Sequence, residues 1–527
     1  MSSTSLWIAF GALAICTATG LVSVTFGPDN YQDLRFYHLY APWAYLHGRY
    51  PVDVAPAESQ TYFNPVADFL FYGMASSFLN GMPRFIAFVM GAVHGLNAVL
   101  VAAIAAHVIR PRDPPTRVAL TVAATLIGVS GAGFVPLIGT TSNDLINSIF
   151  VLGGLLGILR VADQTNAQAA WRGFAWSGLL AGVGLGLKYT AAVFVPGFAV
   201  IAVVAAMRRK MPAAIVTFGA CAALGFIVFA GHHLFTLWRE FDNPIFPMLN
   251  NVFGSPYFDP ISSADEQFRP RDVWQLIAYP FYWVKTTHYI ISESPLRDWR
   301  GALAYVAIAA ALVTCIVGWR RQREQDGGRE TCGLGLVMVF VAVSYLAWAP
   351  VFGNIRYAVV LEMLTGVIVV GVVTWLARGR ARRIGSAGAL VAIVAATTIY
   401  PDWGRGQFGE RYIDVRVPSL PANSLVLIVT RQPVAFFIPY AEPTARYLAI
   451  ENDFLALSQS NRLVAEVESQ MRTPDRAKFA VRVAGHDEDR FERVLDHFGL
   501  TLGPSPCRPI ESNLENPALS LCPLVAR

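Results

Sequence analysis

Two carboxylates, an arginine, a histidine and several aromatic rings follow an apolar segment near the start of this chain, in the run GPDNYQDLRFYH from Gly27 to His38. If the run is helical, Asp29 and Asp33 share a face, and their repulsion makes one of them the better proton acceptor. Asp33 is our first candidate for a general base because it lies beside the aromatic residues, and Asp29 is the second. Alternatively, Asp29 caps the helix and Asp33 pairs with Arg35 or a lipid-facing cation.

Two cationic side chains lie within or beside apolar segments, where burying a positive charge has a high free-energy cost. Lys188 interrupts an apolar hairpin in the sequence GLGLKYT, and Arg356 opens a late apolar segment just before Tyr357. Ionisable groups at membrane depth normally have a partner or a task. The planar guanidinium of Arg356 matches phosphate bidentately, and Lys188 is a second phosphate-binding candidate. Alternatively, each side chain reaches up to lipid headgroups, or one of them pairs with Glu362.

The residue types offer little for a metal. A divalent ion needs several oxygen ligands, of which Asp29, Asp33 and Asp53 supply only some, so we predict no metal cofactor. No Cys or His spacing typical of zinc occurs. Near the C-terminus, Cys507 and Cys522 are predicted to form a disulfide that closes a loop of about 15 residues.

These residues must be positioned by membrane-spanning helices. Hydrophobic residues make up 54% of the 527, charged residues 15%, and mean hydropathy is +0.44, which is typical of a polytopic membrane protein. A retained first helix is expected over Ser5 to Phe26, because about 20 apolar residues cross a core of roughly 30 Å. Ten further apolar segments bring the expected number of spans to about eleven: Phe85 to Ile109, Val118 to Ile138, Leu145 to Val161, Gly173 to Leu187, Thr190 to Met207, Ala213 to Leu237, Gly301 to Trp319, Gly333 to Ala349, Tyr357 to Ala377 and Ile384 to Tyr400.

The cations indicate the orientation of these spans. Arginines and lysines cluster on alternate connections, at 110–117, 208–210, 320–323 and 378–383. By the positive-inside rule these connections are cytoplasmic. The N-terminus is then cytoplasmic, and residues 28–84, 238–300 and 401–527 lie outside, in the periplasm of a bacterial inner-membrane protein. The net charge of +5 therefore reflects topology, and nucleic-acid binding is not predicted.

Two features of the first outer loop are predicted to lie at the membrane surface. Phe36, Leu39, Tyr40, Trp43 and Leu46 recur at helical spacing, which predicts an amphipathic helix lying flat on the bilayer. The apolar run 66–79 is shorter than a typical membrane-spanning helix, so we place it at the membrane–water interface.

The last 127 residues, 401–527, read as a small α/β domain that follows the membrane part, 1–400. Strands are predicted over 424–430 and 478–484, with a helix near 463–471. A second helix follows, in which Phe491, Val494, Leu495 and Phe498 form one buried face. A lid, an acceptor platform or an assembly surface are the roles we consider.

Four sequence pieces together resemble the membrane-embedded glycosyltransferases of the GT-C superfamily, most closely the bacterial family 87 and polyprenol-phosphate-sugar-dependent mannosyltransferase-like members. The pieces are DLRFY from Asp33, leading to LHGRYP from Leu46; GLKY before the helix containing Pro196; DNPIFP from Asp242; and Arg356-Tyr357 at the start of a late span. The resemblance covers roughly the first 400 residues. It depends on the order of the four pieces and on their predicted location on the same side of the membrane.

The resemblance implies that Asp33 accepts the proton of an acceptor hydroxyl as its oxygen attacks the sugar of a polyprenyl-phosphate donor, with inversion. Arg356 and Lys188 would stabilise the leaving phosphate, and Tyr357, His38 and Arg35 would complete the donor site. The acceptor is a lipid, a glycan or a protein. The adjacent Asp-Glu pair of some relatives is absent, because Leu34 follows Asp33.

Two asparagines at outer span ends, Asn64 and Asn243, are candidates for contacts to the sugar or the acceptor, and the alternative is that each is a turn or cap residue. Asp144 is a third polar residue of this kind, and we predict no catalytic role for it.

Other functions remain open. A transporter or flippase also has many spans and buried charges, but it tends to place them at the midplane and to contain inverted repeats, which this sequence lacks. A polymerase or ligase of lipid-linked polysaccharides would use paired arginines in a large outer loop, such as Arg269 and Arg271.

Overall fold

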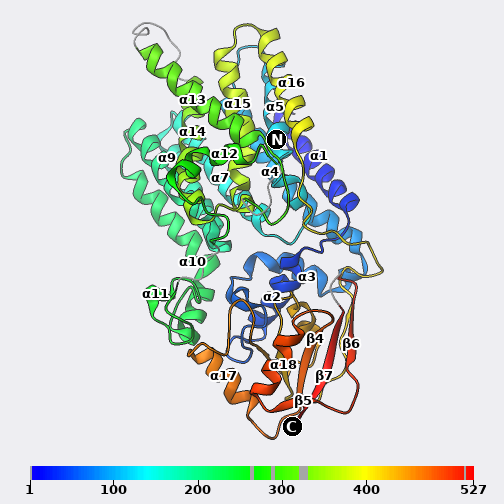
Figure 1. The fold of residues 1–527 in the computed structure, drawn as a ribbon. Helices are drawn as coiled ribbons and strands as arrows, with labels where there is room; N and C mark the ends of the chain where they lie inside the picture. Colours follow the sequence, from blue (N-terminus) through cyan, green and yellow to red (C-terminus); the bar gives the residue numbers. More distant parts are fainter. Residues whose placement is uncertain (1–2, 262–265, 286–290, 320–329, 515–517) are drawn as a thin grey trace.

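The computed structural model describes residues 3–261, 266–285, 291–319, 330–514 and 518–527 of the protein (Figure 1). Arg320, Arg321 and Arg323, part of one predicted cytoplasmic cluster, lie outside these residues. Long helices fill one end of the molecule, and the strands of the C-terminal domain lie at the other end (Figure 1).

Every one of the eleven predicted apolar segments contains a helix in the structure. The helices are α1 (Ser3–Phe26), α4 (Pro83–Val108), α5 (Pro114–Val129), α7 (Asp144–Asp163), α8 (Ala167–Leu187), α9 (Val195–Arg208), α10 (Ala214–Phe241), α13 (Arg300–Trp319), α14 (Glu330–Val351), α15 (Val359–Leu376) and α16 (Arg380–Thr397). Among the described residues, seven helices are long and apolar enough to cross a membrane. The structure therefore has the architecture of a multi-pass membrane protein.

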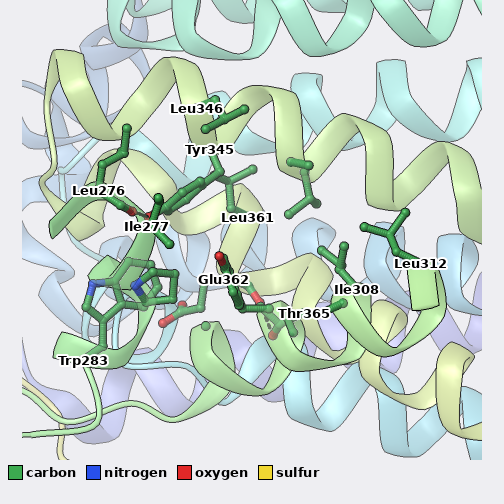
Figure 2. Close-up of a pocket in the computed structure, with 17 residues that line it drawn as sticks. Leu276, Ile277, Trp283, Ile308, Leu312, Tyr345, Leu346, Leu361, Glu362 and Thr365 are labelled. Carbon is green, nitrogen blue, oxygen red and sulfur yellow. Dashed lines mark hydrogen bonds between the residues drawn. The ribbon is translucent and has the colours of Figure 1, made fainter. Parts of the chain in front are cut away.

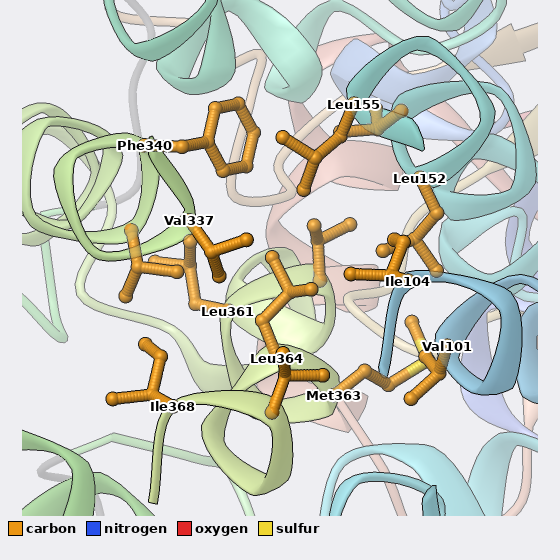
Figure 3. Packing of buried hydrophobic residues seen from close by; sticks show 14 of the residues in the cluster. Val101, Ile104, Leu152, Leu155, Val337, Phe340, Leu361, Met363, Leu364 and Ile368 are labelled. Carbon is orange, nitrogen blue, oxygen red and sulfur yellow. The ribbon is translucent and has the colours of Figure 1, made fainter. Parts of the chain in front are cut away.

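Helix α15 lies at the centre of the bundle. All fourteen residues from Val359 to Val372 are buried, as expected for a helix that is apolar all round. Its Leu364 and Ile368 pack among side chains of α4, α7 and α14, including Ile104 and Leu155 (Figure 3). The segment just before α15, which carries Arg356, is consequently held in a fixed position by the core.

Small residues bring α8 and α10 into close contact. A Cβ added at Gly178 or Gly182 of α8 would overlap the backbone oxygens of Phe218 and Ala222 in α10. Such close approach of two backbones is how membrane helices gain packing energy without a hydrophobic driving force. Helix α8 ends beside Lys188, whereas α10 continues past this point to Phe241.

The C-terminal domain contains a seven-stranded mixed sheet. Its strands are β1 (Val415–Arg416), β2 (Leu425–Ile428), β3 (Arg446–Ala449), β4 (Lys478–Val483), β5 (Leu500–Leu502), β6 (Arg508–Ser512) and β7 (Leu519–Ala526). The order is β1-β6-β7-β4-β2-β3, with β5 also paired to β7. Strands β3, β2 and β4 are parallel, and β7 is antiparallel to β4.

The predicted elements of this domain are confirmed. Strands β2 and β4, helix α17 (Arg462–Met471) and helix α18 (Glu488–His497) occupy the predicted positions. Phe491, Val494 and Leu495 of α18 are buried, and Phe498 packs against the same cluster. The disulfide Cys507–Cys522 is present.

The first outer loop is part of the C-terminal domain's packing and does not lie flat on a membrane, so that expectation is wrong. It folds as η1 (Leu34–His38), α2 (Tyr40–Leu46), η2 (Glu58–Tyr62), η3 (Val66–Asp68), α3 (Phe69–Ala75) and η4 (Phe78–Gly81). Tyr40 and Trp43 pack in one cluster with Val426 and Ile428 of β2 and with η7 (Ala435–Tyr440). A strand presents alternate side chains to opposite faces of a sheet. The first outer loop covers one face of this sheet, and α17 and α18 cover the other.

The run 66–79 does not span a membrane. It breaks into η3, α3 and η4, and about ten helical residues extend only about 15 Å. The placement of this run outside the set of spans is consistent with its structure.

The second outer loop joins the same assembly. It contains α11 (Asn250–Phe253) and α12 (Val273–Tyr282). The backbone N–H of Arg462 at the start of α17 donates to the carbonyl of Pro256 (2.9 Å), and Asn461 donates to Asp259 (3.2 Å). The three predicted outer pieces thus meet at one end of the helix bundle. Helix α12, which packs against α13, was not predicted.

Candidate functional site

Four charged side chains from distant parts of the chain meet at the end of the bundle that faces the C-terminal domain. Asp33 directly precedes η1, Asp144 opens α7, Lys188 joins α8 to η5 (Tyr189–Phe194), and Arg356 lies in η6 (Ile355–Ala358) before α15. We call these four residues the charge cluster. Three of them, Asp33, Lys188 and Arg356, are residues that the sequence singled out.

The charges of the cluster alternate. Lys188 Nζ lies 2.6 Å from Asp144 Oδ1, and Arg356 Nη1 lies 3.0 Å from Asp33 Oδ2. Arg356 Nε is 4.0 Å from Asp144 Oδ2, which connects the two pairs. The side chains of Arg356 and Asp144 are 5% and 3% exposed, whereas those of Asp33 and Lys188 are 18% and 16% exposed. A ligand arriving from outside therefore reaches Asp33 and Lys188 first.

Aromatic rings hold the two cations in place. The Arg356 guanidinium lies 4.9 Å from the centre of the Tyr31 ring, and Lys188 Nζ lies 5.2 Å from that of Tyr357. Arg356 Nη1 also donates to the Tyr31 hydroxyl. Burial raises the pKa of Tyr31 well above its usual value, so the hydroxyl stays neutral and accepts this bond. Cation–π contacts of this kind stabilise a partly desolvated charge.

Asp29 does not share a helix face with Asp33, so the expected repulsion between them does not arise. Residues 27–30 are not helical, and Asp29 forms a β-bridge with Arg405. Its Oδ2 accepts bonds from the backbone N–H and the hydroxyl of Thr141 (2.7 and 2.6 Å), and its Oδ1 accepts from the N–H of Tyr31 (2.9 Å). The side chain is buried and fixes the loop that carries Asp33.

His38 and Arg35 lie on η1 behind Asp33. His38 is fully buried, and its Nδ1 lies 2.6 Å from Asp68 Oδ1, which also accepts a bond from Asn143 (2.7 Å). Among the described residues His38 Nε2 has no partner. Arg35 is half-buried in the same turn. Because Asn143 precedes Asp144, the His38–Asp68 pair fixes the start of α7 against the first outer loop.

The two asparagine candidates make structural hydrogen bonds. Asn64 donates to the carbonyls of Gly186 (2.7 Å) and Phe229 (3.0 Å), so it holds the first outer loop against the end of α8 and the middle of α10, near Lys188. Asn243 donates to the carbonyl of Met248 (3.0 Å) within the second outer loop. Both therefore hold loops, as the turn-or-cap alternative expected.

Asp144 is the residue whose importance the sequence analysis missed. It ends the polar run Thr140–Asp144 at the start of an otherwise apolar helix, and that run was the available signal. Its partners are Lys188, Arg356 and the hydroxyl of Ser142 (2.7 Å). Glu362, the alternative partner for the cations, instead accepts bonds from the backbone N–H groups of Gly133 (2.8 Å) and Phe134 (2.9 Å).

An apolar cavity of about 340 Å³ opens between α12, α13, α14 and α15. Ile277, Trp283, Tyr345 and Leu361 line it, with Glu362 and Thr365 at one side (Figure 2). The cavity does not include the charge cluster. Leu361, which lines the cavity, follows Arg356 of the cluster by five residues, a helical rise of roughly 8 Å.

The described residues contain no group of three or more His, Cys, Asp or Glu side chains arranged to hold a metal ion. The three carboxylates considered for that role lie in different surroundings. Asp33 pairs with Arg356, Asp29 bonds to Thr141, and Asp53 forms an ion pair with Arg49 (2.5 Å).

No protein-family model matches this chain, and no characterised protein is similar enough in sequence to count as a relative. The function proposed next therefore depends on the charge cluster, the cavity and the sequence pieces described above.

Proposed function

We propose that this protein is an integral-membrane glycosyltransferase of the GT-C type, which transfers a sugar from a polyprenyl-phosphate donor to an acceptor hydroxyl, with inversion. The observation that carries the proposal is the charge cluster. It places a partly exposed carboxylate, Asp33, 3.0 Å from a buried arginine, Arg356, with Lys188 beside them. A base and two phosphate-binding cations are the groups that this reaction needs.

The donor would occupy the cluster and the cavity together. Its phosphate would bind to Arg356 and Lys188 in competition with Asp33 and Asp144, which now pair with them. Arg356 Nε has no hydrogen-bond partner among the described residues and is available to a second phosphate oxygen. The first isoprene units would enter the apolar cavity, whose lining residue Leu361 is five residues beyond Arg356.

The chemical step uses Asp33 as the base. Its carboxylate takes the proton from the acceptor hydroxyl while that oxygen forms a bond to the anomeric carbon. The bond between this carbon and the phosphate oxygen breaks, and the electron pair leaves with the polyprenyl phosphate. Arg356 and Lys188 stabilise the negative charge that grows on the phosphate, in a setting where burial strengthens the interaction.

The proposal includes a topology of eleven spans with the N-terminus in the cytoplasm of a bacterial cell and the cluster on the periplasmic side of the inner membrane. Support comes from the meeting of the first outer loop, the second outer loop and the C-terminal domain at one end of the bundle. The acceptor, whether lipid, glycan or protein, would approach from that side.

The test is transfer of radiolabelled sugar by the purified full-length protein in nanodiscs supplied with polyprenyl-phosphate mannose, galactose or arabinose and a membrane-extract acceptor. The proposal predicts product with the wild type and with Asp489→Asn, an exposed carboxylate of α18. It predicts none with Asp33→Asn. Equal transfer by both variants would rule out Asp33 as the base, and absence of transfer with all donors would overturn the proposal.

The same preparation separates the alternatives. A flippase would move labelled lipid-linked sugar across vesicles without forming a new glycosidic bond. A polymerase with paired arginines is disfavoured by the contacts of Arg269, which pairs with Glu266 (2.8 Å) and donates to the carbonyl of Val351 (2.9 Å).

A further inference from the structure

A second cavity, of about 310 Å³, lies at the outer end of α10 against the first outer loop. Its walls come from Tyr45, Tyr50, His232, Thr236, Arg239 and Glu240, and Gly48 leaves one side open. Helix α10 runs from the bundle toward the C-terminal domain (Figure 1). The cavity lies near the C-terminal end of this helix, away from the centre of the bundle. It has the size of a small-ligand site. None of its lining residues belongs to the charge cluster.

The aromatic wall of this cavity is held in a fixed arrangement. The Tyr45 hydroxyl is hydrogen-bonded to His232 Nδ1, and the two rings meet edge to face with centres 5.4 Å apart. The Tyr45 ring also packs edge to face on Tyr50, at 6.5 Å. Flat rings fixed in this way offer apolar faces together with polar edges.

Polar atoms without partners stand in and behind this wall. Tyr50 and His233 are buried, their rings are 5.9 Å apart, and neither the Tyr50 hydroxyl nor His233 Nδ1 has a hydrogen-bond partner in the part of the chain that the structure describes. A buried polar group left unpaired costs about 1–3 kcal/mol. Both atoms are buried, so a ligand in the cavity would meet the Tyr50 ring and the polar groups of Tyr45, His232 and Thr236.

The charges of the cavity cancel. Arg239 Nε donates to Glu240 Oε1 at 2.8 Å. Among the described residues that line the cavity, these two side chains carry opposite charges and neutralise each other. An anion such as a phosphate would have to break this pair. A neutral ligand with several hydroxyl groups and apolar ring faces would not, and a sugar ring has this chemistry.

We propose that this cavity binds a neutral sugar unit of the acceptor, which thereby docks on the outer loop that carries Asp33. The acceptor role rests on the proposed function, whereas binding of the sugar does not. The cavity and Asp33 are connected through η1 and α2, and Asn64 anchors the same loop to α10 one turn from His233.

The test is saturation-transfer NMR on the full-length protein in nanodiscs with methyl glycosides of mannose, galactose and arabinose as probes. We expect saturation transfer to the ring protons of at least one glycoside. Thr236→Trp fills the cavity and should abolish it, whereas Val228→Trp, an exposed position on the same helix, should not.

Several results would overturn this inference. They are the absence of saturation transfer with all three glycosides, an equal signal with Thr236→Trp, or binding of glycerol 3-phosphate in place of the glycosides, which would indicate a lipid headgroup. Asp33→Asn separates the two proposals, since it should abolish sugar transfer and leave glycoside binding unchanged. Glycoside binding by a protein that transfers no sugar would refute the proposed function alone.

Discussion

Glu58 gives the contact between the first outer loop and the C-terminal domain a dependence on pH. Its side chain is buried, and Oε1 has no partner among the described residues. Burial, followed by the charge of Asp453, raises the pKa of Glu58, while the backbone N–H of Asp453 and the cations Arg431 and Arg490 lower it, and the net result is a pKa of about 7.

The size of the effect follows from the shift. In the unfolded chain Glu58 has a pKa of about 4.5, so the two states differ by about 2.5 pH units, or about 3 kcal/mol. Below pH 4.5 both states are protonated and no penalty exists. Between pH 4.5 and 7 the unfolded state releases its proton first, so stability falls as pH rises, and above pH 7 the full penalty remains.

The assay is pulse proteolysis in urea of the full-length protein in nanodiscs, with cleavage followed in the C-terminal domain at pH 4.5, 6 and 8. Glu58→Gln should match the wild type at pH 4.5 and be more stable by about 3 kcal/mol at pH 8. Glu492→Gln, an exposed residue of α18, should match the wild type throughout. A stability difference for Glu58→Gln that stays constant with pH, or that grows toward acid, would refute the reasoning.

Three further predictions concern packing. Lys188→Met leaves the Asp144 carboxylate buried without its closest cation and should lower the free energy of unfolding by about 3 kcal/mol. In a double-mutant cycle, Lys188→Met/Asp144→Asn should recover most of this loss. Additive losses would show that the two side chains are not coupled. Replacing Cys507 and Cys522 by alanine should lower the stability of the C-terminal domain by about 3 kcal/mol in urea unfolding, and unchanged midpoints would contradict this. Asn64→Ala leaves the Gly186 carbonyl in the last turn of α8 unpaired and should cost about 1–2 kcal/mol, measured as a fall in melting temperature that a surface Asn→Ala variant does not show.

Local patterns were sufficient for the long apolar helices and for β2, β4, α17 and α18. Helix α15 is apolar at nearly every position, and the buried face of α18 repeats at helical spacing, so both can be predicted without knowledge of any partner. The disulfide Cys507–Cys522 was predictable because these were the only cysteines of the outer tail.

The packing of one element on another was not predictable in the same way. Trp43 and Tyr40 form an apolar face that fits a membrane surface as well as a protein surface, and only the three-dimensional arrangement shows that β2 and η7 cover it. Pairing across long separations has the same difficulty. Asp144 and Lys188 are 44 residues apart, and Asp33 and Arg356 are 323 apart, so no sequence spacing connects them.

The central claim is that Asp33 accepts the proton of the acceptor in a site where Arg356 binds the donor phosphate. The most direct measurement is the rate of sugar transfer by Asp33→Asn at saturating polyprenyl-phosphate donor, together with donor binding by the same variant. The account predicts a rate at least about 100-fold lower with donor binding retained, since general bases contribute about 10²–10⁴-fold. Transfer at the wild-type rate would contradict it.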